Sequence, residues 1–336
     1  MTAEPQPTSV NPAAARSPAA HYLLDPVVFG TLCGLFSATV YTAANVFLRS
    51  VSHCDPIWVS AVKALPTALF MAPWLVWNRR RGIGTFPSWP IFAAIAAGGL
   101  LGQVGGNVSF QWALGQIGVA LTVPLTLGGM IVAASLLGRF ALHEPIPVRS
   151  AVAIIILLAA ICVLSLGAKE ARQSVAAVAG NPWQLAAGVG AACFSGLAYS
   201  VLNVVIRYAV QRGASLPAML FTVSIVGMLS LGSLSLGQIG LAGMGATTSV
   251  DLGMMLLGGV CNAVAFVALT KSLQLTSVVY VNALNATQAT LAAAAGIVFF
   301  HEAASQSLVL GVGLTIAGLL FMRQRKKSPQ DTIDRA

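Results

Sequence analysis

Polar side chains recur at every fourth position in two long apolar segments of this chain. They form two matching sets: Ser37, Tyr41, Asn45 and Arg49, and Ser195, Tyr199, Asn203 and Arg207. Residues four apart lie on one face of a helix, so each set predicts one polar stripe. Polar groups inside a membrane are costly unless they face a cavity or a partner. We expect the stripes to form the walls and paired gates of a central path. Alternatively, the arginines extend to lipid headgroups and the asparagines bond neighbouring helices.

Lys63 is the one charge that lies well inside an apolar segment. Its depth, counted from the nearer end of its segment, is similar to that of Tyr41. A buried ammonium group is expensive and needs hydrogen-bond acceptors. We predict that Lys63 contacts the carboxylate of a solute or titrates during a working cycle. The alternative is a structural hydrogen bond to backbone carbonyls or to Tyr41.

Asparagine side chains in other segments offer further amide groups. Asn107 lies beside a glycine series with spacing four, which permits close helix approach. We expect it to line a cavity, and the alternative is a hydrogen bond within a tight helix contact. Three more asparagines could hold a zwitterion or another polar solute: Asn262, Asn282 and Asn285.

A His-Glu pair occurs twice, as His143-Glu144 and His301-Glu302. Each pair opens a predicted helix, and a carboxylate at a helix N-terminus interacts favourably with the helix dipole. We therefore expect Glu144 and Glu302 to share a structural or gating role rather than a catalytic one. The sequence contains neither a GxxxxGK[ST] phosphate loop nor an HExxH zinc motif. We predict no cofactor and no metal site, and the five scattered cysteines indicate apolar packing rather than disulfides.

The elements that would position these residues are long apolar segments. The 336 residues are 57% hydrophobic and 8% charged, whereas soluble domains carry about 25% charged residues. Apolar runs of about 20 residues, enough to cross a bilayer as a helix, recur along the chain, without the alternation of a membrane strand. We predict an all-α integral membrane protein with ten transmembrane helices, at residues 27–48, 56–77, 91–112, 119–140, 148–166, 183–206, 215–236, 252–272, 277–300 and 306–322.

The distribution of basic residues predicts the orientation in the membrane. If the N-terminus is cytosolic, fourteen Lys and Arg residues fall on the inner side and three, Arg49, Lys169 and Arg172, on the outer side. Because cytosolic loops are enriched in Lys and Arg, we expect both termini in the cytosol. The short loops favour a bacterial plasma membrane, that is, the inner membrane. The net charge of +9 then reflects orientation, and nucleic-acid binding is not expected.

The sequence also repeats itself at an offset of 158 residues. The window Phe36–Arg49 matches Phe194–Arg207 at six positions, and the two His-Glu pairs match in the same register. Each copy holds five predicted helices, an odd number, so the copies would cross the membrane in opposite senses, as in many secondary transporters. The predicted divisions are a disordered cytosolic tail at 1–25, a first repeat at 26–168, a linker at 169–181, a second repeat at 182–322 and a basic cytosolic tail at 323–336.

Two segments of the chain resemble a known family. Ala113–Leu166 and Lys271–Met322 each contain a short helical link, a helix rich in small residues, a Glu-containing loop and a Gly-containing final helix. In this the chain is similar to the ten-helix members of the drug/metabolite transporter superfamily, which have two EamA-type repeats. It departs from them at Ile131 and Ala289, where many repeats carry Pro, and at Lys63, where Arg is usual. The resemblance implies export, less often import, of amino acids, other metabolites or drugs without nucleotide hydrolysis.

Together these patterns predict a secondary transporter, an exporter rather than an importer, of small organic solutes by alternating access. Its partners would be a small-molecule solute and the lipid bilayer, and a homodimer is left open. Two alternatives come from other classes. A channel or non-transporting membrane sensor fits an inverted repeat less well, and an integral-membrane enzyme would need clustered acid–base groups.

Overall fold

The computed structural model describes residues 25–82, 87–141, 148–175, 182–276 and 278–321, and every regular element in these ranges is helical. The elements are α1 (Pro26–Ser50), α2 (Pro56–Arg80), α3 (Trp89–Leu100), η1 (Leu101–Asn107), α4 (Val108–Ala141), α5 (Val148–Val175), α6 (Pro182–Gln211), α7 (Leu216–Gly245), α8 (Ser249–Leu275), α9 (Val278–Phe300) and α10 (Gln306–Phe321). The expectation of an all-α protein is thereby confirmed.

Six of the described helical stretches are long and apolar enough to cross a membrane: Pro26–Ser50, Pro56–Arg80, Trp89–Ala133, Trp183–Ile206, Leu216–Gly245 and Ser249–Ser272. Three shorter helices, Ala151–Leu164, Thr287–Phe300 and Gln306–Gly318, are also apolar. The observed bounds agree with most expected spans to within a few residues. The main differences are α5 and α7, which continue beyond the expected ends to Val175 and Gly245.

The starts of α1 and α2 follow from one local pattern, an Asp followed by a Pro. Asp25 accepts a hydrogen bond from the Val27 amide at 2.7 Å, and Asp55 accepts from the amides of Ile57 and Trp58 at 3.1 and 2.8 Å. The side chain satisfies amides that have no partner within the helix. The proline that follows is already in a helical conformation and needs no amide partner.

A single glycine breaks the long helical stretch from α3 through α4. Gly118 has φ 75° and ψ 175°, a conformation that is essentially restricted to glycine. The expected spans 91–112 and 119–140 therefore meet at this break. The sequence analysis missed the element before it: η1 is a π-helix, a form that is rare and frequent at functional sites.

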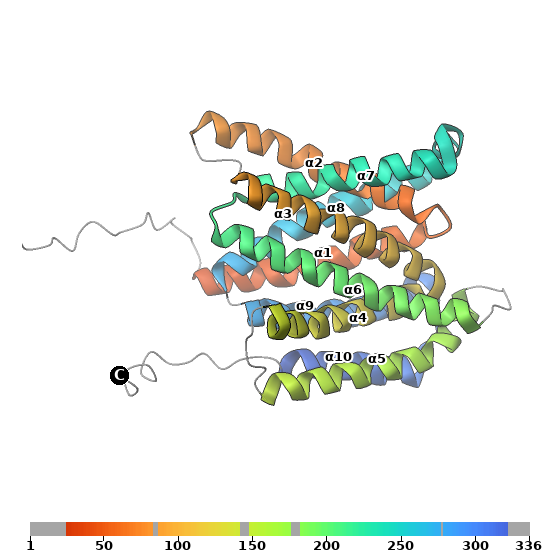
Figure 1. The fold of residues 1–336 in the computed structure, drawn as a ribbon. Coiled ribbons are helices and arrows are strands. Elements are labelled where there is room, and N and C mark those ends of the chain that lie inside the picture. The colour runs from red at the N-terminus through yellow and green to blue at the C-terminus, as the bar shows by residue number, and fades with distance from the viewer. Residues whose placement is uncertain (1–24, 83–86, 142–147, 176–181, 277, 322–336) are drawn as a thin grey trace, which may run out of the picture.

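The helices form two bundles, which contain equivalent helices of the two repeats, and two flanking pairs. One bundle packs α1 against α8 and α9, and the other packs α6 against α3, η1 and α4. The flanking pairs are α2 with α7 and α5 with α10, and they lie at opposite edges of the molecule (Figure 1). Each bundle thus joins the first helix of one repeat to the third and fourth helices of the other.

The crossings within the bundles are close because small residues lie at them. A Cβ atom added at Gly196 on α6 would lie 2.4 Å from the Thr126 carbonyl oxygen and 2.6 Å from the Met130 nitrogen, both on α4. In the other bundle, the Ser37 hydroxyl donates to the Ala265 carbonyl across α1 and α8 at 2.8 Å. Close backbone approach and hydrogen bonds between helices are the usual means of association in lipid.

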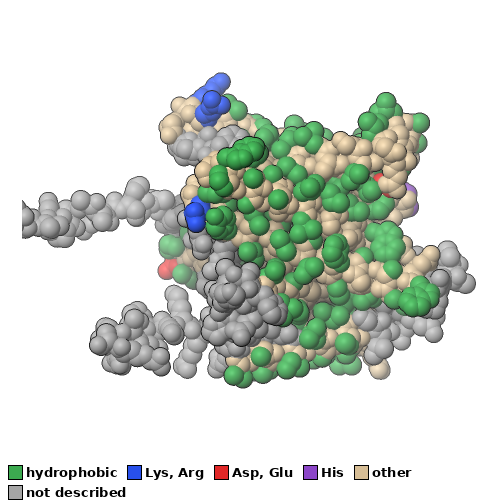
Figure 2. Space-filling view, in the orientation of Figure 1, with side chains coloured by type: hydrophobic (Ala, Val, Ile, Leu, Met, Phe, Trp, Pro, Cys, Tyr) green, Lys and Arg blue, Asp and Glu red, His purple; other side chains and the backbone are tan. Residues whose placement is uncertain are grey.

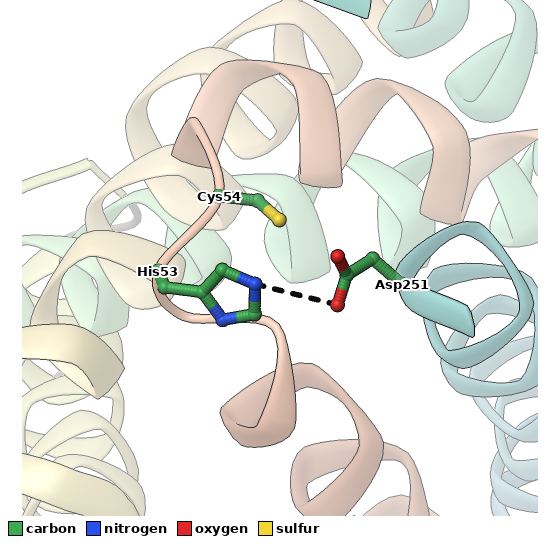
Figure 3. A group of neighbouring side chains, drawn as sticks. All are labelled: His53, Cys54 and Asp251. Atoms are coloured by element: carbon green, nitrogen blue, oxygen red, sulfur yellow. Dashed lines mark ion pairs between the residues drawn. The ribbon is translucent and has the colours of Figure 1, made fainter. Parts of the chain in front are cut away.

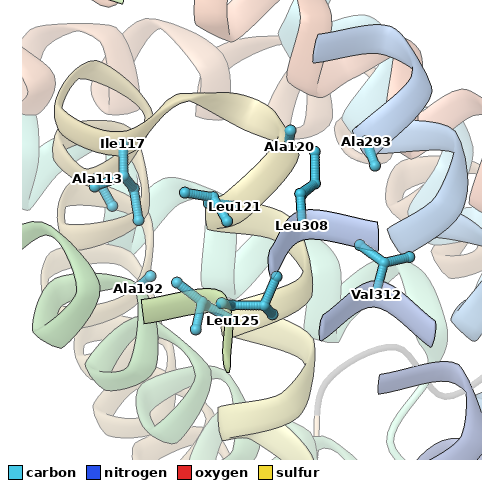
Figure 4. Close-up of a cluster of buried hydrophobic side chains, with 10 residues drawn as sticks. Ala113, Ile117, Ala120, Leu121, Leu125, Ala192, Ala293, Leu308 and Val312 are labelled. Carbon is cyan, nitrogen blue, oxygen red and sulfur yellow. The ribbon is translucent and has the colours of Figure 1, made fainter. Parts of the chain in front are cut away.

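One hydrophobic core lies around the break at Gly118. Its buried members come from α4, α5, α6, α9 and α10, and Figure 4 shows several of them meeting beside the turn of α4. They are Ala113, Ile117, Ala120, Leu121, Leu125, Leu164, Ala192, Ala293, Leu308 and Val312. Both halves of the chain therefore contribute to one continuous core.

The outer surface is apolar along the helices and basic at one end. Large side chains such as Trp89, Trp183 and Leu241 are each more than three-quarters exposed, which suits a surrounding of lipid. Figure 2 shows hydrophobic side chains spread over the visible face and Lys and Arg side chains at the end where α2 finishes. The side chains of the helices face a bilayer rather than water.

Candidate functional site

A buried polar network lies where α2, η1 and α6 meet. The Lys63 ammonium donates to the Asn107 side-chain oxygen at 2.7 Å, and the Tyr199 hydroxyl donates to the same oxygen at 2.5 Å. The Asn107 amide nitrogen donates in turn to the Gln103 side-chain oxygen. Lys63, Asn107 and Gln103 are all less than a tenth exposed. The structural alternative for Lys63 is therefore corrected, because its partner is Asn107 rather than Tyr41 or a backbone carbonyl.

The π-helix explains how one short segment supplies two members of this network. Gln103 and Asn107 both lie in η1, whose sequence Leu-Gly-Gln-Val-Gly-Gly-Asn has three glycines. At Gly102 and Gly106 an added Cβ atom would lie 2.6 and 2.7 Å from the side chains of Leu202 and Tyr199. The glycines thus allow α6 to approach η1 closely enough for Tyr199 to reach Asn107.

Lys63 has no carboxylate within ion-pair distance among the residues that the structure describes. It is 5% exposed, and a buried cation without a counter-charge is costly. Two other residues of the predicted set, Tyr41 and Asn285, lie on α1 and α9. Tyr41 on α1 is half-buried. The side-chain oxygen of Asn285 on α9 is inaccessible and has no hydrogen-bond partner in the described part of the chain.

A second polar cluster is built around the Glu302 carboxylate. One oxygen accepts from the Val119 amide at 2.9 Å and the other from the Ala120 amide at 2.8 Å. The first oxygen also lies 3.4 Å from the Arg49 guanidinium. The Glu302 side chain is fully buried and that of Arg49 is 11% exposed. Arg49 further donates to the Ser52 hydroxyl at 2.5 Å and lies 5.5 Å from the centre of the Phe300 ring.

This geometry corrects the expected position of Glu302. The residue does not open its own helix, since α10 begins at Gln306. Its carboxylate instead caps the N-terminal end of the α4 segment that follows Gly118, where unpaired amides and the helix dipole favour an anion. His301 directs it there with φ 52°, a left-handed conformation that is uncommon for residues other than glycine. Arg49 faces this carboxylate and does not extend away from the protein as the headgroup alternative requires.

The Glu302 cluster joins the two bundles at one end. Glu302 follows α9 and Arg49 lies near the end of α1, both in the first bundle, whereas Val119 and Ala120 begin the α4 segment of the second. The carboxylate makes charged hydrogen bonds to both sides, which are stronger than neutral ones. The cluster therefore acts as a clasp between α1, α4 and α9.

Comparison with known proteins assigns the chain to a family. Residues 27–166 and 186–324 each match the EamA-like transporter family. The chain belongs to that family. It is a multi-pass membrane protein with two EamA repeats, and membership of the drug/metabolite transporter superfamily is confirmed. No curated protein sequence matches the chain. Several solved structures are similar to this chain. A crystal structure among them has 15% sequence identity and a TM-score of 0.51, and the match covers 89% of this chain and 98% of the other. This similarity concerns the fold alone.

The two EamA repeats do not share the Lys63 network. At the offset of 158 residues, Lys63 corresponds to Phe221, Gln103 to Cys261 and Asn107 to Ala265. Only the tyrosine of the network has an equivalent, since Tyr41 corresponds to Tyr199. Lys63, Gln103 and Asn107 thus come from the first repeat alone, whereas each repeat contains one His-Glu pair.

The remaining predicted residues lie in several environments. Asn45 is buried on α1, whereas Asn203 is exposed and donates weakly to the Met130 sulfur at 3.5 Å. Ser37 and Ser195 are fully buried, and Asn262 is half-buried. The polar stripe of α6 therefore does not face one cavity as expected. Glu144 and the side chains of Arg207 and Asn282 lie outside the described residues.

Two cavities lie away from the Lys63 network. One of about 340 Å³ is apolar and lies between α1 and α9, with Thr39, Val46 and Phe299 among its lining residues. The other, of about 420 Å³, lies where α2 begins and is lined by residues that include Asp55, Trp112 and Gln238. The residues of the network contact one another directly, so its centre is closed in this conformation.

Sequence reasoning missed the amides of Val119 and Ala120. Gln103 was recognisable from its spacing of four to Asn107, although the π-helix that holds both was not. Backbone amides carry no side-chain signal, and Gly118 was the one residue that could have indicated a break at which they become available.

Proposed function

We propose that this protein carries small organic solutes across the plasma membrane by alternating access, through ten crossings in two inverted five-helix repeats. Six long and three shorter apolar helices supply the crossings, once the break at Gly118 divides Trp89–Ala133 into two. Five crossings in each repeat reverse the orientation of the second. The Lys and Arg distribution supports cytosolic termini, and with them an outer side that holds Arg49.

The observation that carries this proposal is the clasp made by Glu302. It holds the α1/α8/α9 bundle to the α3/α4/α6 bundle at the end that the charge distribution assigns to the outside. A carrier needs a contact of this kind, which closes one mouth and must break when that mouth opens. The contact between the bundles consists of the two amide hydrogen bonds, whereas the ion pair of Glu302 with Arg49 lies within the first bundle. A modest binding energy can overcome a contact of this strength.

The repeat supports a second clasp at the opposite mouth. Glu144, Arg207 and residues 277–278 are the equivalents of Glu302, Arg49 and residues 119–120 at the offset of 158 residues. Since the repeats are inverted in this proposal, these equivalents lie at the inner mouth. One clasp would open as the other forms.

The polar centre supports a solute that carries a carboxylate. Lys63 has three ammonium protons, and among the described residues its ammonium donates to the Asn107 side chain and pairs with no carboxylate. It can therefore bind an anionic group. The side-chain oxygen of Asn285, which has no hydrogen-bond partner among the residues that the structure describes, can accept from an amino group. Amino acids and related carboxylate metabolites offer both groups, and we propose export as the direction.

Solute counterflow in proteoliposomes tests this function. Vesicles are loaded with unlabelled amino acids or carboxylic acids, and uptake of the labelled solute is followed against its gradient, which a channel cannot drive. We expect counterflow with the wild type, its loss in Lys63→Gln, and partial activity in the charge-conserving Lys63→Arg. Equal counterflow in Lys63→Gln would refute the role of Lys63, and its absence with every solute in folded wild type would refute the carrier.

A further inference from the structure

Three side chains with metal-binding atoms meet where α1 ends and α8 begins. His53 and Cys54 lie in the loop between α1 and α2, and Asp251 lies in the first turn of α8. One nitrogen, one sulfur and one oxygen from these residues all lie within 4.8 Å of one another. Figure 3 shows the three side chains pointing toward a common space, with His53 Nε2 3.3 Å from Asp251 Oδ1.

The two segments are held together by contacts outside this group. The Thr248 hydroxyl donates to Asp251 Oδ2 at 2.7 Å, which leaves Oδ1 directed at His53. The Trp58 indole donates to the Thr247 hydroxyl at 3.0 Å and joins the start of α2 to the turn before α8. Hydrogen bonds that orient the ligating groups are a regular feature of metal sites.

The types of donor atom select a class of metal. Calcium and magnesium prefer oxygen ligands alone, whereas a combination of thiolate, imidazole and carboxylate suits zinc and related transition metals. An ion pair between His53 and Asp251 would be a simpler reason for their contact. Such pairs at exposed positions contribute little to stability, and the His53 side chain is 63% exposed. The ion pair also does not involve the sulfur.

We propose that His53 Nε2, Cys54 Sγ and Asp251 Oδ1 bind a divalent transition-metal ion of the zinc class. The hydrated ion would exchange three waters for these ligands and keep a water in the remaining position. The Cys54 thiol would release its proton to solvent, and neutral His53 would carry its proton on Nδ1. No oxidation or reduction takes place. This proposal replaces the expectation that the chain has no metal site.

The position of the site gives metal binding a structural consequence. Burial and the neighbouring Asp251 and Asp55 raise the pKa of the Cys54 thiol. Ser52, next to His53, accepts the hydrogen bond from Arg49. A bound ion would therefore tether the loop that holds Arg49 to α8. Metal binding itself does not depend on the proposed transport.

Cobalt binding to the full-length protein in detergent, without a histidine tag, tests the site. Co²⁺ bound by a thiolate gives a sulfur-to-cobalt charge-transfer absorption, and Zn²⁺ should displace it. We expect one equivalent of Co²⁺ per chain in the wild type. The charge-transfer band should disappear in Cys54→Ser, and affinity should fall by at least about tenfold in His53→Ala and Asp251→Asn. Cys33→Ser and Cys261→Ser, which change free cysteines elsewhere, should leave the band and affinity unchanged.

Two results would overturn the proposal. One is a charge-transfer band that persists in Cys54→Ser, and the other is wild-type affinity no higher than that of His53→Ala. Gel filtration and thermal unfolding without metal show whether each variant is folded. His53 is exposed, so His53→Ala remains a usable variant if Cys54→Ser does not fold. The assay measures no transport, so failure of the carrier assignment would leave its result unaffected.

Discussion

At the scale of single residues, the Glu302 carboxylate is the most constrained group in the molecule. It is buried, accepts hydrogen bonds from two consecutive amides and faces Arg49. A buried ion pair is weak evidence for stability by itself, because desolvation offsets the attraction. The two amides change this balance, since the helix terminus supplies fixed positive ends of dipoles without a further ion. The carboxylate is therefore stabilised mainly by α4 and oriented by Arg49.

Removal of either charge should destabilise the closed clasp. We expect Glu302→Gln to lower the free energy of unfolding by about 2–4 kcal/mol, because Arg49 and one amide lose their charged partner. Arg49→Gln should cost less, since the amides still hold the carboxylate. Thermal unfolding in detergent of both single variants and the double variant gives the coupling energy.

The matched control is Arg212→Gln, which changes an exposed arginine that stacks on Tyr208. Its unfolding should be close to that of the wild type. A coupling energy of zero between Arg49 and Glu302 would mean that the ion pair plays no part in the clasp.

At the scale of elements, the break at Gly118 is what makes the clasp possible. It ends one helical segment and begins another, so the amides of Val119 and Ala120 become available. The second repeat has its break at the equivalent place, between the end of α8 at Leu275 and the start of α9 at Val278. There Thr276 has φ −134°, so the same interruption is made without glycine.

Gly118→Ala should disrupt this break in two ways. The backbone conformation of Gly118 costs an alanine about 1–3 kcal/mol, and its Cβ atom would lie 2.4 Å from the Glu302 carboxylate. Gly240→Ala is the matched control, because Gly240 has nearly the same backbone angles, φ 66° and ψ 176°, with nothing near its Cβ position.

Both alanine variants should unfold at a lower temperature than the wild type, and Gly118→Ala by clearly more. When Glu302→Gln is added to Gly118→Ala, we expect no further loss of stability, because the contact between the carboxylate and the α4 amides is already lost. When it is added to Gly240→Ala, the full effect of Glu302→Gln should remain. Equal destabilisation by the two substitutions would show that the contact with Glu302 contributes nothing beyond backbone strain.

The sequence predicted these elements better than it predicted their contacts. Long apolar runs located the helices, because lipid permits few other backbone structures. The contacts of Glu302 depend on which helix ends lie side by side, which the local sequence does not encode. The π-helix was missed for a similar reason, since its glycines fit either a packed α-helix or the wider turn that brings Gln103 and Asn107 to Lys63.

At the scale of the whole molecule, each of the two bundles is built from helices of both repeats. Each bundle takes its first helix from one repeat and two helices from the other, so neither repeat can move as a separate domain. The flanking pairs α2/α7 and α5/α10 also join the repeats. Relative motion of the bundles therefore requires changes at the helix ends, where the clasp lies, while the tight crossing of α4 and α6 at Gly196 stays fixed.

The central claim is that the two repeats cross the membrane in opposite senses, so that equivalent helix ends lie at opposite mouths. Side-specific labelling with a membrane-impermeant thiol reagent tests it directly, in a variant with the five native cysteines replaced. A single cysteine is placed at His53, beyond the end of α1, or at Arg212, beyond the end of α6, both exposed. We predict that His53→Cys is labelled from outside intact cells and Arg212→Cys only in inverted vesicles. Labelling of both from the same side would contradict the account.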